Sequence, residues 1–180
     1  MGYAGGRKSE PNYHDLGDHT ESIEVVFDPK QVSYEDLLKA FWSSHSPERR
    51  APSRQYASLI FCGDEAQKKL ALASTTREEE RRKAKLYTEI VPAGTFWPAE
   101  DYHQKYYLRS HRDLLGEFQA IYPKEADFVA STAVARVNGY LGGSGTAAQL
   151  EAELPRLGLS PEGQKRLLEL AKRLRPITCQ

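Results

Sequence analysis

The sequence contains little cysteine, and its charges favour neither sign. Among 180 residues there are two cysteines, Cys62 and Cys179, which argues against a disulfide scaffold and against a cysteine-rich metal site. A reducing, cytoplasmic location is therefore expected. Lys and Arg together number 25, and so do Asp and Glu. Because these charges balance, no overall field attracts the chain to nucleic acid or to a membrane, and neither is expected as a partner.

Long apolar runs and clustered histidines are also lacking. No apolar run approaches the roughly 20 residues that a membrane-spanning helix needs, and residues 1–15 lack the apolar core of a signal peptide. The histidines have neither the tight spacing nor the third ligand that indicates zinc. His14 and His19 flank acidic residues, so only a weak metal site is open there. We expect neither a metal nor a cofactor.

The length of 180 residues suits one domain with an appendage and is enough to bury a core. Up to about residue 120, strand-like and helix-like segments alternate. Beyond Tyr122 and Pro123 the sequence becomes helical and is interrupted by glycine-rich turns. We predict a core over residues 1–120 and a helical C-terminal extension over residues 121–180, in which no chemistry is visible.

Residue patterns predict the elements of this core. Alternation of apolar and polar residues predicts strands over residues 22–27, 55–62 and 86–91. Ser33 with Asp36, and Asp64 with Gln67, have the spacing of capping boxes, and they predict helices over residues 33–45 and 65–84. Residues 1–18 are rich in glycine and turn residues and are predicted to form a loop.

Glu21 stands out at the start of the first predicted strand. The two-residue period puts Glu21 and His19 on the same face as Ile23, Val25 and Phe27. Burial there would disfavour the charged carboxylate and raise its pKa, as suits a proton donor. The alternative is that Glu21 turns into solvent or pairs with an Arg or Lys. The pattern alone leaves both interpretations open.

Seven stretches, in this order and spacing, resemble the A-type peptide methionine sulfoxide reductases over residues 2 to 110. They are GYAGG at 2–6, PNYHD at 11–15, HTE at 19–21, VVFDP at 25–29, SYEDLLKAFWSSH at 33–45, RQYASLIF at 54–61 and TEIVPAGTFWPAEDYHQKYYL at 88–108. Each stretch alone is a weak signal, but seven collinear stretches together are specific.

The resemblance implies an α/β sandwich around a small mixed sheet, and it implies a reaction. A cysteine thiolate attacks the sulfur of the S epimer of methionine sulfoxide, free or in proteins, and becomes a sulfenic acid. Thioredoxin or another thiol then reduces that sulfenic acid. Glu21 matches the family's acid, and Tyr13 and Tyr56 match the two hydroxyls that hold the departing oxygen. His19 lies beside the acid in the same motif and positions it.

The resemblance also implies a nucleophile that this sequence does not show. In the family, the attacking cysteine lies in a glycine–cysteine–phenylalanine–tryptophan–glycine motif upstream of the GYAGG stretch, and this chain begins at that stretch. Two smaller departures accompany it. Ala51 stands at the spacing of an expected aspartate, and Asp18 stands where a glycine usually precedes the histidine.

Neither cysteine of the chain is a good substitute nucleophile. Cys62 lies on the order of 20 Å from Tyr56 along the predicted strand, at about 3.3 Å per residue, and is interpreted as a buried small residue. Cys179 could reach the pocket on a flexible tail but has no attacking cysteine to resolve. We therefore expect an N-terminally truncated reductase without turnover on dithiothreitol. The alternatives are a non-catalytic relative that binds methionine sulfoxide or partner proteins, and a poorly folding fragment.

Overall fold

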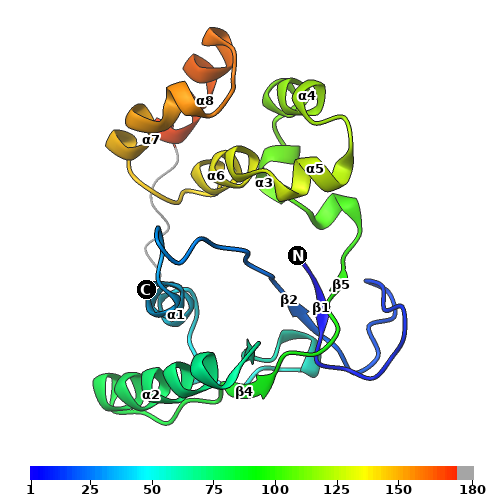
Figure 1. Cartoon of the computed structure of the whole chain (residues 1–180), viewed down its shortest axis with the longest axis vertical. Helices are drawn as coiled ribbons and strands as arrows, with labels where there is room; N and C mark the ends of the chain where they lie inside the picture. The colour runs from blue at the N-terminus through cyan, green and yellow to red at the C-terminus, as the bar shows by residue number, and fades with distance from the viewer. Residues whose placement is uncertain (174–180) are drawn as a thin grey trace. The chain divides into compact units, whose positions relative to one another are not determined.

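The computed structural model describes residues 1–173, which fall into two compact units (Figure 1). The first unit is Met1–Glu100, and the second begins at Asp101. Strands and two long helices make up the first unit, and helices make up the second. The predicted mixed α/β class is confirmed. The boundary between the two compact units falls between residues 100 and 101. The predicted boundary between residues 120 and 121 is a different one, the end of the family-like core, and it stays a prediction.

A three-stranded antiparallel sheet is centred on β1 (Gly2–Ala4), with β2 (Thr20–Ser22) and β5 (Trp97–Pro98) on its two sides. Tyr3 lies opposite both Glu21 and Trp97. A Cβ on Gly2 would lie 2.4 Å from the Trp97 carbonyl oxygen, so only glycine lets the strands approach this closely. The prediction of a loop over residues 1–18 is wrong at β1, because pairing with distant residues stabilises a strand too short to show a pattern.

The predicted strand over residues 22–27 is also wrong. Residues 23–27 are irregular, and Val26 is 94% exposed. The register explains this difference. Ser22 pairs with Gly2, which is the first residue of β1, so β1 pairs with no residue after Ser22. Within residues 1–173, the segment after Ser22 finds no other strand to complete its backbone hydrogen bonds.

The second sheet of this unit is a parallel pair, β3 (Leu59–Cys62) and β4 (Glu89–Pro92), connected through α2 (Glu65–Arg82). Helix α1 (Tyr34–Ser43) packs with α2. The Ser33–Asp36 capping box is present, and Asp64 accepts a hydrogen bond from the Gln67 amide, so both helix starts are confirmed. The core of this region contains Leu38, Trp42, Ile60, Cys62, Ala71 and Leu86.

Both remaining strands are shorter than predicted. Residues 55–62 do not form one strand, because Arg54–Tyr56 is a 3-10 turn, labelled η1, and β3 starts only at Leu59. The Ala57 amide donates to the Arg54 carbonyl and closes that turn. The strand predicted from residue 86 begins at Glu89, where parallel pairing with Leu59 begins.

Helices of the second unit surround one apolar core, which includes Leu108, Phe118, Phe128, Leu150 and Leu167. Among residues 1–173, no helix combines the length and apolar character that a bilayer span requires. The helices, with two 3-10 turns, are η2 (Asp101–His103), α3 (Tyr106–Arg109), α4 (Arg112–Ile121), α5 (Glu125–Ala130), α6 (Thr132–Leu141), α7 (Ala147–Glu153), η3 (Leu154–Arg156) and α8 (Pro161–Arg173).

Candidate functional site

Glu21 is the acid around which the candidate site is arranged. It lies in β2, is half-buried, and accepts a hydrogen bond from the Gln55 side-chain amide at 2.7 Å. Its partner is thus a neutral amide from η1, and neither the Arg nor the Lys partner considered from the sequence is bonded to it among residues 1–173. A neutral donor orients the carboxyl group without the strong stabilisation of the carboxylate that a guanidinium would give.

His19 is buried, and both of its ring nitrogens are bonded to backbone. The Gly6 amide donates to Nδ1 at 3.2 Å, so Nδ1 is the acceptor, and Nε2 therefore donates to the Lys8 carbonyl at 2.8 Å. These bonds fix the ring and attach residues 6–8 to the start of β2. Both ring nitrogens of His19 are thus used within the protein.

Asp18 strengthens the same attachment, a role that the sequence did not indicate. Its carboxylate accepts hydrogen bonds from the backbone amides of Arg7, at 2.8 Å, and Lys8, at 3.3 Å. The Arg7 amide is the main cause that lowers the pKa of Asp18. A Cβ on Gly6 would lie 2.5 Å from the Asp18 carboxylate and 2.7 Å from the His19 ring. The close approach of these loops therefore depends on Gly6 having no side chain.

Two hydrogen bonds hold η1, the turn that contains Tyr56, against β2. Gln55 binds Glu21, and the Thr20 hydroxyl donates to the Arg54 carbonyl at 2.8 Å. Tyr56 itself ends η1 and is 56% exposed. The sequence placed Tyr56 on a strand, but the structure presents it on a turn held against β2. The Tyr56 side chain is therefore accessible to solvent on a turn that contacts β2.

Tyr13 lies in a turn that Glu100 anchors. The Glu100 carboxylate accepts from the Tyr13 backbone amide at 3.0 Å and from the Tyr3 hydroxyl at 2.7 Å. Tyr3 is opposite Glu21 in the sheet, so this acid links the Tyr13 turn to the strand next to Glu21. Nothing in the sequence pattern indicated Glu100, because the partners that it joins lie almost a hundred positions away.

Cys62 is placed in the core rather than in this site. Its side chain is 5% exposed, and its sulfur lies 4.0 Å from the Tyr34 hydroxyl. Burial raises the pKa of the Cys62 thiol, which disfavours the reactive thiolate. The sequence argument from the distance between Tyr56 and Cys62 along one strand does not apply, because Tyr56 lies outside β3. Burial of the Cys62 side chain is a separate reason against attack by this residue. Cys179 lies outside the described residues.

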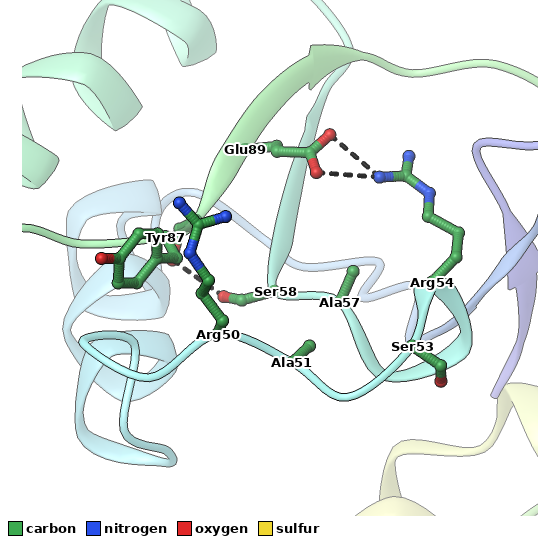
Figure 2. Close-up of a pocket in the computed structure, with 9 residues that line it drawn as sticks. Arg50, Ala51, Ser53, Arg54, Ala57, Ser58, Tyr87 and Glu89 are labelled. Carbon is green, nitrogen blue, oxygen red and sulfur yellow. Dashed lines mark hydrogen bonds and ion pairs between the residues drawn. The ribbon is translucent and has the colours of Figure 1, made fainter.

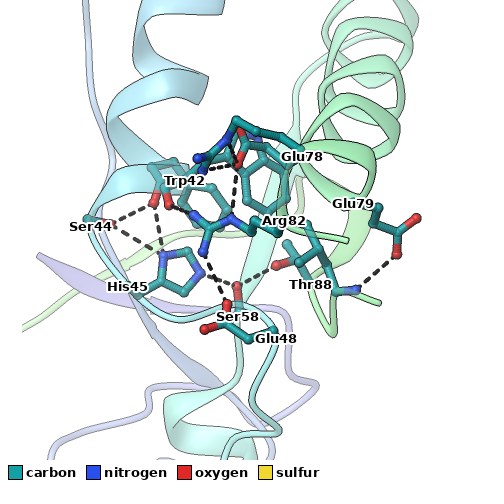
Figure 3. Close-up of polar contacts among 12 residues, drawn as sticks. Trp42, Ser44, His45, Glu48, Ser58, Glu78, Glu79, Arg82 and Thr88 are labelled. Carbon is teal, nitrogen blue, oxygen red and sulfur yellow. Dashed lines mark hydrogen bonds and ion pairs between the residues drawn. The ribbon is translucent and has the colours of Figure 1, made fainter. Parts of the chain in front are cut away.

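A polar network joins His45, Ser58 and Thr88 (Figure 3). His45 Nδ1 lies 2.9 Å from the Phe41 carbonyl and therefore donates to it, so Nε2 accepts from the Ser58 hydroxyl at 2.9 Å. The Ser58 oxygen in turn accepts from the Thr88 hydroxyl at 2.8 Å. Burial is the main cause that lowers the pKa of His45. This network joins the end of α1 to the residues that precede β3 and β4.

A pocket of about 480 Å³ opens beside η1 (Figure 2). Its lining includes Arg50, Arg54, Ser58, Tyr87 and Glu89. Among residues 1–173, no three His, Cys, Asp or Glu side chains are grouped so that they could hold a metal ion. The charged donors at this pocket are the guanidinium groups of Arg50 and Arg54, which bind anions rather than cations.

Comparison with known proteins gives a consistent result. The family described as "Peptide methionine sulfoxide reductase" matches residues 1–136. A Drosophila melanogaster protein named "Peptide methionine sulfoxide reductase" is 44% identical over 165 residues, 89% of this chain and 65% of that protein. An Oryza sativa protein, "Peptide methionine sulfoxide reductase A5", is 38% identical over 78% of this chain and 57% of its own length. The chain therefore spans only about three fifths of these two relatives.

A solved structure also resembles the chain. It is described as "Crystal structure of Mxr1 from Saccharomyces cerevisiae in reduced form", and the likeness has a TM-score of 0.56 with 26% sequence identity. The match covers 62% of this chain and 69% of the yeast chain. The mixed α/β arrangement is thus found in an experimentally determined relative.

Proposed function

The chain belongs to the peptide methionine sulfoxide reductase family, and we propose that Glu21, Tyr13 and Tyr56 form the oxygen-binding half of a site for the S epimer of methionine sulfoxide. The observation that supports this most directly is the bond from Gln55 to Glu21, which holds an acid beside the exposed Tyr56. An orientated acid beside phenolic hydroxyls suits a ligand whose polar atom is a hydrogen-bond-accepting oxygen.

The proposed reaction assigns each group one task. A thiolate attacks the sulfoxide sulfur while Glu21 gives a proton to the sulfoxide oxygen, and the tyrosine hydroxyls donate hydrogen bonds to that oxygen. The oxygen passes to the attacking sulfur, so methionine leaves reduced and the cysteine becomes a sulfenic acid. A second thiol displaces water from the sulfenic acid and forms a disulfide with the cysteine, and a further thiol, from thioredoxin or a small reductant, then reduces this disulfide to release the cysteine thiol. We propose that this chemistry repairs oxidised proteins in the cytoplasm.

The attacking thiolate is not Cys62 in this proposal, because its side chain is buried and its thiol pKa is raised. The chain as given is therefore expected to bind the sulfoxide without turning it over on dithiothreitol. Binding, rather than turnover, is the property that tests the site in this chain. Turnover that depends on Cys62 would contradict the assignment.

Calorimetry with a short peptide carrying the S-sulfoxide, the R-sulfoxide or unmodified methionine tests the proposal. We expect the S-sulfoxide peptide to bind best. Tyr56→Phe should reduce that preference because it removes a donor to the sulfoxide oxygen. Glu21→Gln should reduce it because an amide N–H is a weaker donor than a carboxylic acid O–H and cannot give up its proton. Glu24→Gln is the matched control, because Glu24 is exposed and lies beyond the end of β2. Equal binding of all three peptides by folded protein would overturn the proposal.

A second candidate function is sulfoxide binding without catalysis. The observation that favours it is that the one cysteine among the described residues is buried. The two candidates differ when a segment with the family's cysteine motif is joined to Met1. Turnover of the S-sulfoxide by the extended chain, lost again in its Glu21→Gln variant, supports the reductase. Retained binding without turnover supports the binding protein.

A further inference from the structure

The pocket beside η1 has cations on its walls and little negative charge to balance them (Figure 2). Arg54 binds both carboxylate oxygens of Glu89 at 2.9 Å, so this pair is neutral. Arg50 has no ion-pair partner among residues 1–173, and its guanidinium carbon lies 4.4 Å from the centre of the Tyr87 ring. Two arginines and one glutamate therefore leave the pocket with one net positive charge, located at Arg50.

The Tyr87 ring prepares Arg50 to bind an anion. Stacking on an aromatic face restricts the long arginine side chain and leaves the edge of the guanidinium, with its paired donors, facing outward. The Ser58 and Thr88 hydroxyls, which also line the pocket, cannot donate to the same anion. Ser58 uses its proton on His45 and Thr88 uses its proton on Ser58, so neither has one for an anion. Of the charged donors that line the pocket among residues 1–173, Arg50 is the one without a carboxylate partner, so it is the one expected to bind a negative group.

The turn η1 contributes residues both to the pocket and to the proposed sulfoxide site. Arg54 lines the pocket, while its backbone carbonyl accepts from Thr20 and its neighbour Gln55 binds Glu21. The pocket and the acid thus lie against the same three-residue turn, Arg54–Tyr56. A peptide with its oxidised methionine at Glu21 would pass this turn with an adjacent side chain.

We propose that this pocket is a specificity subsite, in which Arg50 binds the carboxylate of an aspartate or glutamate that flanks the methionine sulfoxide. The inference rests on the proposed sulfoxide site. One net positive charge matches a single carboxylate, and a volume of about 480 Å³ accommodates an acidic side chain. The ligand class is therefore an acidic sulfoxide peptide, rather than any protein that carries an oxidised methionine.

Calorimetry with paired S-sulfoxide peptides tests the subsite. The peptides differ only in having Glu or Gln at one position, and each position near the sulfoxide is tried in turn. At the best position, we expect the Glu peptide to bind about three- to fivefold more tightly, as for an exposed charge pair, and less so at high salt. A Glu preference that is absent at every position would overturn the inference.

Three variants locate the effect. Arg50→Ala should remove the Glu preference, and Ala51→Asp should remove it too, because Ala51 lines the pocket and a carboxylate there would occupy Arg50. Arg49→Ala is the matched control, since Arg49 is equally exposed but does not line the pocket. If Arg50→Ala keeps the full preference, or Arg49→Ala loses it, the subsite is assigned wrongly. Thermal unfolding checks that each variant is folded.

Peptides with unmodified methionine separate this inference from the function on which it rests. If S-sulfoxide and methionine peptides bind equally but Glu is still preferred through Arg50, the anion pocket is correct and the sulfoxide site is wrong. If the S-sulfoxide peptide is preferred but the Glu and Gln peptides bind equally, the sulfoxide site is correct and the anion pocket is wrong.

Discussion

Different kinds of contact stabilise the two units of this chain, each within itself. In the second unit, the core side chains Phe118, Leu150 and Leu167 are fully buried between helices. In Met1–Glu100, the candidate site is held by single hydrogen bonds between residues far apart in sequence, such as Thr20 with Arg54 and Tyr3 with Glu100. Apolar burial is roughly additive over many atoms, whereas one such hydrogen bond decides where a whole turn lies. The second unit should therefore respond to lost volume, and the first to lost polar atoms.

The largest effect is expected from Phe118→Ala. Removing a fully buried phenylalanine should cost about 3–5 kcal/mol, because the surrounding helices close the cavity only in part. Urea unfolding followed by circular dichroism measures the loss. Gln119→Ala, on the same helix but exposed, should change stability by no more than about 0.5 kcal/mol. If Phe118→Ala also abolishes peptide binding by Met1–Glu100, the expectation that lost volume affects only the second unit is wrong.

The next largest effect is expected from Thr20→Val, which preserves shape and removes the hydroxyl that binds the Arg54 carbonyl. An unpaired buried polar group costs about 1–3 kcal/mol, and η1 would lose one of its two attachments to β2. We expect weaker binding of the S-sulfoxide peptide together with lower stability. Thr75→Val is the control, because the Thr75 hydroxyl binds Ala71 within one helix, and that local bond positions nothing else. Equal effects of the two variants would remove the distinction between long-range and local bonds.

Two substitutions with smaller expected losses of stability allow the two units to be compared directly. Ser33 and Thr146 each complete a capping box, one on α1 and one on α7. Replacing either with alanine should cost about 1 kcal/mol. Hydrogen exchange resolved by residue should show each loss within its own unit. A loss that spreads over both units after either change would mean that they unfold as one.

The sequence predicted the two helices of Met1–Glu100 better than it predicted the strands of this unit. Caps at Ser33 and Asp64 are local signals, and they placed the starts of α1 and α2 correctly. Strand patterns failed where pairing decided the outcome. Val26 has the alternation of a strand but no partner among residues 1–173, whereas β1 is a strand with almost no pattern. A residue such as Glu100 has no local signal at all, since its role exists only when distant segments meet.

The smallest expected effect is a dependence of stability on pH, which should affect Met1–Glu100 alone. Burial holds the pKa of His45 below its ordinary value of 6.5, while the nearby Arg82 lowers it further and Glu48 opposes this. In the unfolded chain the imidazole takes up a proton near its ordinary pKa, whereas in the folded chain it stays neutral and accepts from Ser58. The stabilisation is therefore complete above pH 6.5 and is lost as the pH falls through the folded pKa. His45→Gln keeps an acceptor for Ser58 but does not titrate, so urea midpoints of this variant should depend less on pH between neutral and mildly acidic conditions. An unchanged pH dependence in His45→Gln would show that another group of this unit governs it.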